Sequence, residues 1–180
     1  MAKKKRLIKN DTKNTQQQIN NEENNIIYES SKIRTVKFTD KQLDFIRIGL
    51  DSKTRIFFTK GSAGTSKTYL SVYCALNLLF SKQIEKIIFV RTPVESAEHK
   101  MGFLPGDLNE KFNYYAMPFF DKLEELLGKQ AAINLRKTEK LQILPINFLR
   151  GIQWNESVII VDECQNFSIS ELKTLLTRIG

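Results

Sequence analysis

The sequence predicts an α/β fold of three layers, in which helices cover both faces of a mainly parallel sheet. Residues 84–91 and 157–161 are short, almost continuous apolar runs, typical of strands buried on both faces. Helical patterns separate the predicted strands, and 180 residues suit one domain. Residues 1–31 are basic and rich in Asn and Gln, so we expect a disordered arm ahead of a folded domain at 32–180.

The predicted elements follow one another along the folded part. A cap at Thr39 or Asp40 opens a short helix that ends near Gly49. The later elements are a strand at 55–59, a helix at 69–76, a strand at 84–91, loops at 92–107, helices at 108–127 and 131–136, strands at 141–145 and 157–161, and a helix at 170–178. We expect the aromatic side chains within 112–120 to pack in the core, and stacking on bases is the alternative.

A glycine-bearing turn joins the strand at 55–59 to the following helix. Its residues are Gly61, Ser62, Ala63, Gly64, Thr65, Ser66, Lys67 and Thr68. A strand, such a turn and a helix that opens with Lys-Thr form the pattern of a nucleotide-binding P-loop, whose backbone N–H groups face phosphate oxygens. Lys67 would reach the β- and γ-phosphates, and Thr68 would bind Mg²⁺. Ser66 replaces the usual glycine, so we expect binding and leave turnover open; a plain surface turn is the alternative.

Two acidic residues follow the clearest predicted strand. Asp162 and Glu163 come directly after residues 157–161, at the end of the strand where open α/β sheets bind ligands. Asp162 can hold Mg²⁺, and Glu163 can polarise the water that attacks a γ-phosphate. Together with the P-loop, this pair predicts an NTPase site.

Composition narrows the choice of partners and surroundings. The net charge of +8 suits an anionic partner such as nucleic acid, although a cationic surface without such a partner is an equal alternative. Cys74 and Cys164 lie too far apart for a metal or disulfide motif, and His99 is the single histidine. With no apolar run long enough to span a bilayer, we expect a cytoplasmic protein without a membrane partner.

The sequence resembles the PhoH-like P-loop ATPases, which are common in bacteria and their phages and similar to the first motor lobe of superfamily 1 helicases. The resemblance covers about residues 36–180. The matching stretches are 61–68, 91–95, Gly102-Phe103-Leu104-Pro105-Gly106-Asp107-Leu108, 145–151 and 162–166. It implies a RecA-like lobe that binds ATP and Mg²⁺, assembles into homo-oligomeric rings and acts on single-stranded RNA or DNA.

The resemblance also implies roles for single residues. Gln42 would read the adenine edge, although an exposed helix residue is the alternative. Gln165 would sense the γ-phosphate and so join Lys67 and Glu163 in catalysis. Arg91 and Thr92 would contact the nucleic-acid backbone. Arg150 would reach phosphate or a neighbouring subunit, with a structural role equally open.

Departures from the family pattern leave rival functions open. Cys164 stands where the family usually has alanine, and the family pattern continues beyond Gly180 into a strand and a Gly-Asp-x-x-Gln motif. We therefore expect a fragment or a C-terminally shortened protein, of phage or bacterial type and acting in the bacterial cytoplasm. The leading prediction is a Mg²⁺-dependent ATPase that works with single-stranded nucleic acid. The alternatives are an ATP-binding regulatory or assembly module and a P-loop phosphotransferase.

Overall fold

A parallel sheet forms the centre of the protein, in a computed structural model that describes residues 33–34, 36–91, 116–146 and 154–178. Its strands are β1 (Lys86–Arg91), β2 (Leu141–Pro145) and β3 (Ser157–Asp162), in the order β2-β1-β3. Both pairs are parallel, and the strand ends align: Arg91 pairs with Pro145 on one side and with Asp162 on the other. The predicted α/β class with a parallel sheet is confirmed.

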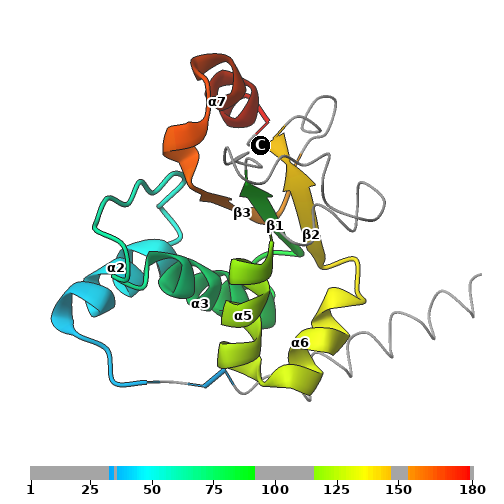
Figure 1. The fold of residues 1–180 in the computed structure, drawn as a ribbon. Coiled ribbons are helices and arrows are strands. Elements are labelled where there is room, and N and C mark those ends of the chain that lie inside the picture. The colour runs from blue at the N-terminus through cyan, green and yellow to red at the C-terminus, as the bar shows by residue number, and fades with distance from the viewer. Residues whose placement is uncertain (1–32, 35, 92–115, 147–153, 179–180) are drawn as a thin grey trace, which may run out of the picture.

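Helices lie on both sides of this sheet. They are α2 (Asp40–Leu50), α3 (Lys67–Phe80), α5 (Met117–Leu127), α6 (Lys129–Arg136) and α7 (Ile169–Leu176), with a short 3-10 turn, η3 (Cys164–Asn166). Figure 1 shows α3, α5 and α6 on one side of the sheet and α7 on the other. Capping boxes at Thr39 and Ser168 fix the starts of α2 and α7. The predicted helix at 108–127 is present from Met117 on, and its earlier part lies outside the described residues.

Strand β1 is buried on both faces because its side chains alternate between two apolar clusters. Ile87 and Phe89 pack with α3, α5 and α6, whereas Ile88 and Val90 pack with Trp154 and with apolar residues of α7. All four β1 side chains are at most 1% exposed. The Phe89 ring also stacks on Phe119 of α5, with 4.5 Å between centroids. The three layers are thus held together through the central strand.

The predicted strand at residues 55–59 is wrong. This segment belongs to no strand of the described sheet, and Ile56 and Phe58 are 52% and 75% exposed. Phe57 instead contacts Phe45 of α2, with ring centroids 4.8 Å apart. An apolar, β-branched run favours extended backbone, but a strand also needs a hydrogen-bonded neighbour, and none of the described strands supplies one here.

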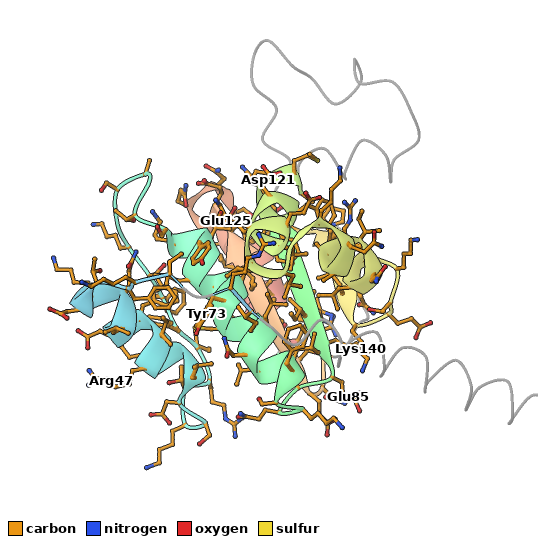
Figure 2. The ribbon with its side chains drawn as sticks, turned by 90° about the horizontal axis from the view of Figure 1, so that it is seen from below. Arg47, Tyr73, Glu85, Asp121, Glu125 and Lys140 are labelled. Atoms are coloured by element: carbon orange, nitrogen blue, oxygen red, sulfur yellow. The ribbon has the colours of Figure 1, made fainter. Side chains whose placement is uncertain are left out.

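Helix α2 lies at the rim of the domain and has no buried residue. The segment just before it is held against α3 by a ring contact: Tyr73 of α3, labelled in Figure 2, meets Phe38 edge-on with 5.1 Å between centroids. Burial raises the pKa of the nearby Cys74 thiol to about 12, as expected for an unreactive cysteine in a core. The predicted arm at 1–31 lies outside the described residues. None of the helices in the described ranges is long and apolar enough to cross a membrane.

Candidate nucleotide site

The glycine-bearing turn leads directly into the first turn of α3. The helix begins at Lys67, and no side chain caps its N-terminus. The first backbone N–H groups of a helix lack intrahelical partners and lie at the positive end of its dipole. An uncapped 14-residue helix behind a glycine-bearing turn is therefore well suited to hold an anion.

The Lys67 side chain folds back over the turn. Its Nζ donates to the carbonyl oxygens of Gly61 and Ser62, at 2.8 Å each, and lies 3.4 Å from the Thr65 hydroxyl oxygen. Thr65 Oγ1 in turn donates to the Ser62 carbonyl at 2.8 Å. A phosphate oxygen could replace these acceptors, because an ammonium group forms a stronger hydrogen bond with an anionic oxygen than with a neutral carbonyl oxygen.

Ser66, the departure from the P-loop pattern, has the left-handed backbone that glycine favours. Its φ and ψ are 63° and 21°, and Gly64 also has a positive φ of 77°. A left-handed conformation costs a non-glycine residue about 1–2 kcal/mol. The turn therefore keeps a glycine-like path at Ser66 at the expense of local strain.

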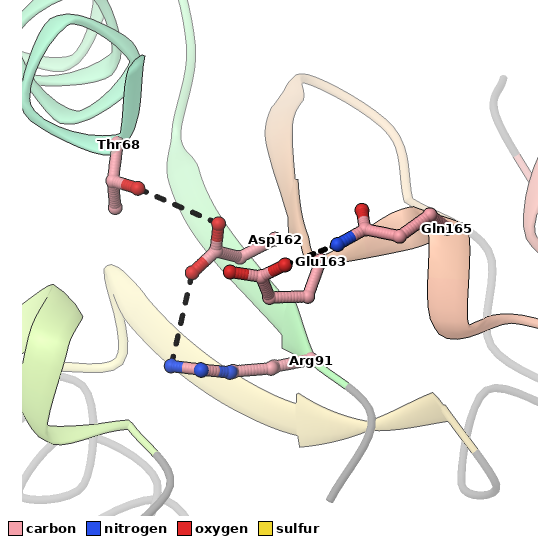
Figure 3. A network of polar contacts seen from close by, with 5 residues as sticks. All are labelled: Thr68, Arg91, Asp162, Glu163 and Gln165. Atoms are coloured by element: carbon pink, nitrogen blue, oxygen red, sulfur yellow. Dashed lines mark hydrogen bonds and ion pairs between the residues drawn. The ribbon is translucent and has the colours of Figure 1, made fainter. Parts of the chain in front are cut away.

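Tertiary structure brings the two halves of the predicted site together. Thr68 Oγ1 on α3 lies 3.4 Å from Asp162 Oδ1 at the end of β3, although the two residues are 94 positions apart. On the other side of the carboxylate, an Arg91 guanidinium nitrogen lies 3.8 Å from Asp162 Oδ2. Figure 3 shows Asp162 between these two neighbours. The ends of β1 and β3 thus share one polar cluster with the start of α3.

The environment of Asp162 opposes its negative charge. Burial is the main cause of a raised pKa for this carboxyl, and the charge of Glu163 raises it further. Arg91 and hydrogen bonds from the Glu163 backbone and Thr68 act in the opposite direction but do not cancel the rise. A cation beside Asp162 would stabilise its ionised form.

Glu163 differs from Asp162 in exposure and backbone. It is exposed and has a left-handed backbone, with φ 54° and ψ 38°, where β3 gives way to η3. Gln165 Nε2 donates to the Glu163 carboxylate, as Figure 3 shows. The structure therefore places Glu163 beside Asp162 with its carboxylate accessible to water and oriented by Gln165.

The described residues offer Mg²⁺ few protein ligands. Thr68 and Asp162 provide a hydroxyl and a carboxylate, the oxygen donors that Mg²⁺ prefers. The described ranges contain no group of three or more His, Cys, Asp or Glu side chains that could hold a metal. This donor set fits a Mg²⁺ ion that takes its remaining ligands from water and nucleotide phosphates rather than from the protein.

Of the other predicted site residues, only some lie within the described part of the chain. Gln42 lies on α2, where its Oε1 accepts from Thr39 N at 2.9 Å and so helps to cap the helix. Its predicted contact with adenine stays a prediction. Thr92 and Arg150 lie outside the described residues. The pairing of Arg91 with Asp162 was not predicted from the sequence. Both residues end apolar runs, but only the knowledge that β1 and β3 are neighbours brings them together.

The fold and the site define a class: an α/β protein with a P-loop at a helix N-terminus and an acidic strand end facing it. Comparison with known proteins identifies the family within this class. Residues 32–180 match the family described as "PhoH-like protein", so the chain belongs to the PhoH family of P-loop NTPases.

Curated relatives agree with this assignment. The chain is 40% identical to a PhoH-like protein of Bacillus subtilis over 125 residues, which are 69% of this chain and 39% of the relative. It is 38% identical to Protein PhoH of Escherichia coli K12 over 143 residues, 78% of this chain and 40% of the relative. A PhoH-like protein of Mycobacterium tuberculosis H37Rv is 37% identical over 131 residues, 73% and 37% of the two chains. The chain thus matches about two fifths of the length of these relatives.

Proposed function

We propose that this protein is a Mg²⁺-dependent ATPase that works with single-stranded nucleic acid. The observation that best supports the proposal is the juxtaposition of Thr68 and Asp162, whose oxygens lie 3.4 Å apart beside the N-terminus of α3. A structural role alone does not require a hydroxyl and a largely buried carboxylate at this place. A Mg²⁺ ion that arrives with a nucleotide would use both as oxygen ligands.

Each side chain has a distinct role in the proposed reaction. Lys67 would leave the carbonyl oxygens of the turn to bind the β- and γ-phosphates, and Thr68 and Asp162 would hold Mg²⁺. When bound, Mg²⁺ supplies charge neutralisation to the phosphates. Glu163 orients a water molecule and takes its proton as the water oxygen bonds to the γ-phosphorus. The bond from the γ-phosphorus to the bridging oxygen then breaks, and ADP and phosphate leave.

A nucleic-acid partner is supported by charge and by family membership. The chain has a net charge of +8, which favours association with a phosphate backbone. Arg91, Thr92 and Arg150 are the residues proposed to contact it, and assembly into a homo-oligomeric ring would place several such surfaces around one strand. The bacterial cytoplasm is the proposed location.

Ser66 supports one alternative, an ATP-binding regulatory or assembly module with little hydrolysis. Its left-handed backbone keeps the path of the turn, but its side chain occupies a position where the usual glycine has none. Such a module would bind Mg²⁺·ATP and would release phosphate no faster when Glu163 is intact than when it is replaced.

The test compares nucleotide binding with phosphate release. Lys67→Ala should weaken ATP binding about 10–100-fold, because a charge-assisted contact is lost. Glu163→Gln should retain binding and slow turnover about 10²–10⁴-fold, the usual contribution of a general base. Lys60→Ala, which removes an exposed lysine just before the turn, is the matched control and should change neither.

Two further outcomes decide between the functions. Stimulation of phosphate release by single-stranded RNA or DNA supports the ATPase, and tight binding without turnover supports the module. Absence of ATP binding by the wild-type protein contradicts both.

A further inference from the structure

The guanidinium of Arg91 occupies an unexpected place for a residue predicted to contact nucleic acid. It points to Asp162 at the shared carboxyl edge of β1 and β3, with 3.8 Å between the charged atoms. The two side chains are only 21% and 19% exposed, so water screens the pair less than it would screen a surface pair. Thr68 approaches the other oxygen of the same carboxylate.

This arrangement puts a positive charge at the carboxylate that Mg²⁺ would need. Lys67, the other cation of the site, is bound to the turn instead. Asp162 is largely buried, and a buried carboxylate without a cation is costly. A guanidinium and a divalent ion at one carboxylate repel each other, so the two compete.

We propose that Arg91 is a place-holding counter-ion: it balances the charge of Asp162 before nucleotide binds, and Mg²⁺ takes this place when the ion arrives with nucleotide. This inference rests on the proposed function only for the identity of the incoming ion. Arg91 disfavours binding of the ion alone. The site therefore favours the Mg²⁺–nucleotide complex, because contacts with its phosphates compensate for the lost Arg91–Asp162 ion pair. Arg91 is thus a positioning residue, acting on the metal through Asp162.

The test measures binding of Mn²⁺ alone, by electron paramagnetic resonance, to the nucleotide-free protein. Arg91→Met should bind Mn²⁺ about tenfold more tightly than wild type, since a neighbouring arginine commonly changes the proton affinity of a carboxylate by at least that factor. The same variant should melt at a lower temperature without metal, and Mn²⁺ should restore part of the loss. Arg91→Lys keeps the charge and should resemble wild type.

Two controls make the result specific. Lys86→Met removes a cation from the opposite end of β1 and should leave Mn²⁺ affinity unchanged. Adding Asp162→Asn to Arg91→Met should abolish the gain, because the ion then lacks its carboxylate.

Three outcomes separate this inference from the proposed function. Equal Mn²⁺ affinity in wild type and Arg91→Met overturns the place-holder. A more than tenfold loss of Mn²⁺–nucleotide binding in Arg91→Met, with no gain for Mn²⁺ alone, also overturns it and makes Arg91 a phosphate ligand. A gain for Mn²⁺ alone in a protein that binds no nucleotide supports the place-holder and contradicts the ATPase.

Discussion

Two apolar runs of similar composition have opposite positions in this protein. Residues 87–90 of β1 are at most 1% exposed, whereas Ile56, Phe57 and Phe58 ahead of the P-loop are 36% to 75% exposed. Strand β1 has a parallel neighbour on each side and an apolar cluster on each face. The earlier run has no partner among the described strands. An apolar, strand-like run is therefore buried here only where neighbouring strands can pair with its backbone.

The difference extends to the two halves of the candidate site. Asp162 and Arg91 end strands that are fixed by their neighbours, so the positions of their side chains follow from the sheet. The P-loop follows the exposed run and is held mainly by contacts of its own, from Lys67 and Thr65 to the turn carbonyls. We therefore expect substitutions of buried apolar side chains in the sheet to lower global stability more than any substitution in the P-loop.

The largest expected effect is that of Phe89→Ala. Phe89 is fully buried in β1 and stacks on Phe119, so its loss leaves a cavity between the sheet and α5. The free energy of unfolding should fall by about 3–5 kcal/mol, as measured by urea denaturation. A loss below about 1 kcal/mol would show that β1 is not the centre of the core.

Much of the fold follows from local sequence. The strands at 141–145 and 157–161 and the capped helices were predictable because alternation, continuous apolar runs and cap residues are local signals. The proximity of Thr68 and Asp162 was also predictable, because both were expected at the edge where a parallel sheet presents ligands.

Contacts set by tertiary structure were not predictable in the same way. The pairing of Arg91 with Asp162 depends on β1 and β3 being neighbours, which no local pattern specifies. Gln42 was interpreted from family resemblance, and its use in a capping box depends on a side-chain conformation. The incorrect prediction of a strand at 55–59 has the same cause, because strand propensity does not supply a neighbouring strand to pair with.

A smaller effect is expected for Ser66→Gly in the P-loop. Glycine removes the left-handed penalty of about 1–2 kcal/mol but adds about 0.5–1 kcal/mol of unfolded-chain entropy, so the net gain should be about 0–1.5 kcal/mol. Ser66→Ala keeps the Cβ and should give no such gain. Thermal unfolding of both variants checks this, and an equal change in the two would assign the effect to the hydroxyl instead.

Asp162→Asn should change the stability by less than Ser66→Gly does. Arg91 and two hydrogen bonds oppose the effect of burial on the pKa of Asp162, so the net effect of its charge is small. The pKa of Asp162 is raised above 3.8, so the folded protein binds this proton more tightly than the unfolded chain. The contribution of Asp162 to stability is therefore present below about pH 3.8 and is lost as pH rises through its folded pKa.

Without nucleotide, Asp162→Asn should accordingly be more stable than wild type at pH 7, and the gap should narrow toward pH 4. Melting temperatures across this range provide the measurement. Asp121→Asn, an exposed acid on α5, is the control and should show little change at any pH. A gap that widens toward pH 4 would mean that Arg91 outweighs burial at Asp162.

The smallest effect on stability is expected for Phe58→Ser, in the exposed apolar run. Phe58 is 75% exposed, so its replacement should change the free energy of unfolding by no more than about 0.5 kcal/mol. Urea denaturation of the same protein preparation used for Phe89→Ala gives a direct comparison of the two runs. A loss above 2 kcal/mol would mean that the side chain is buried in solution, and that the run at 55–59 has a partner there after all.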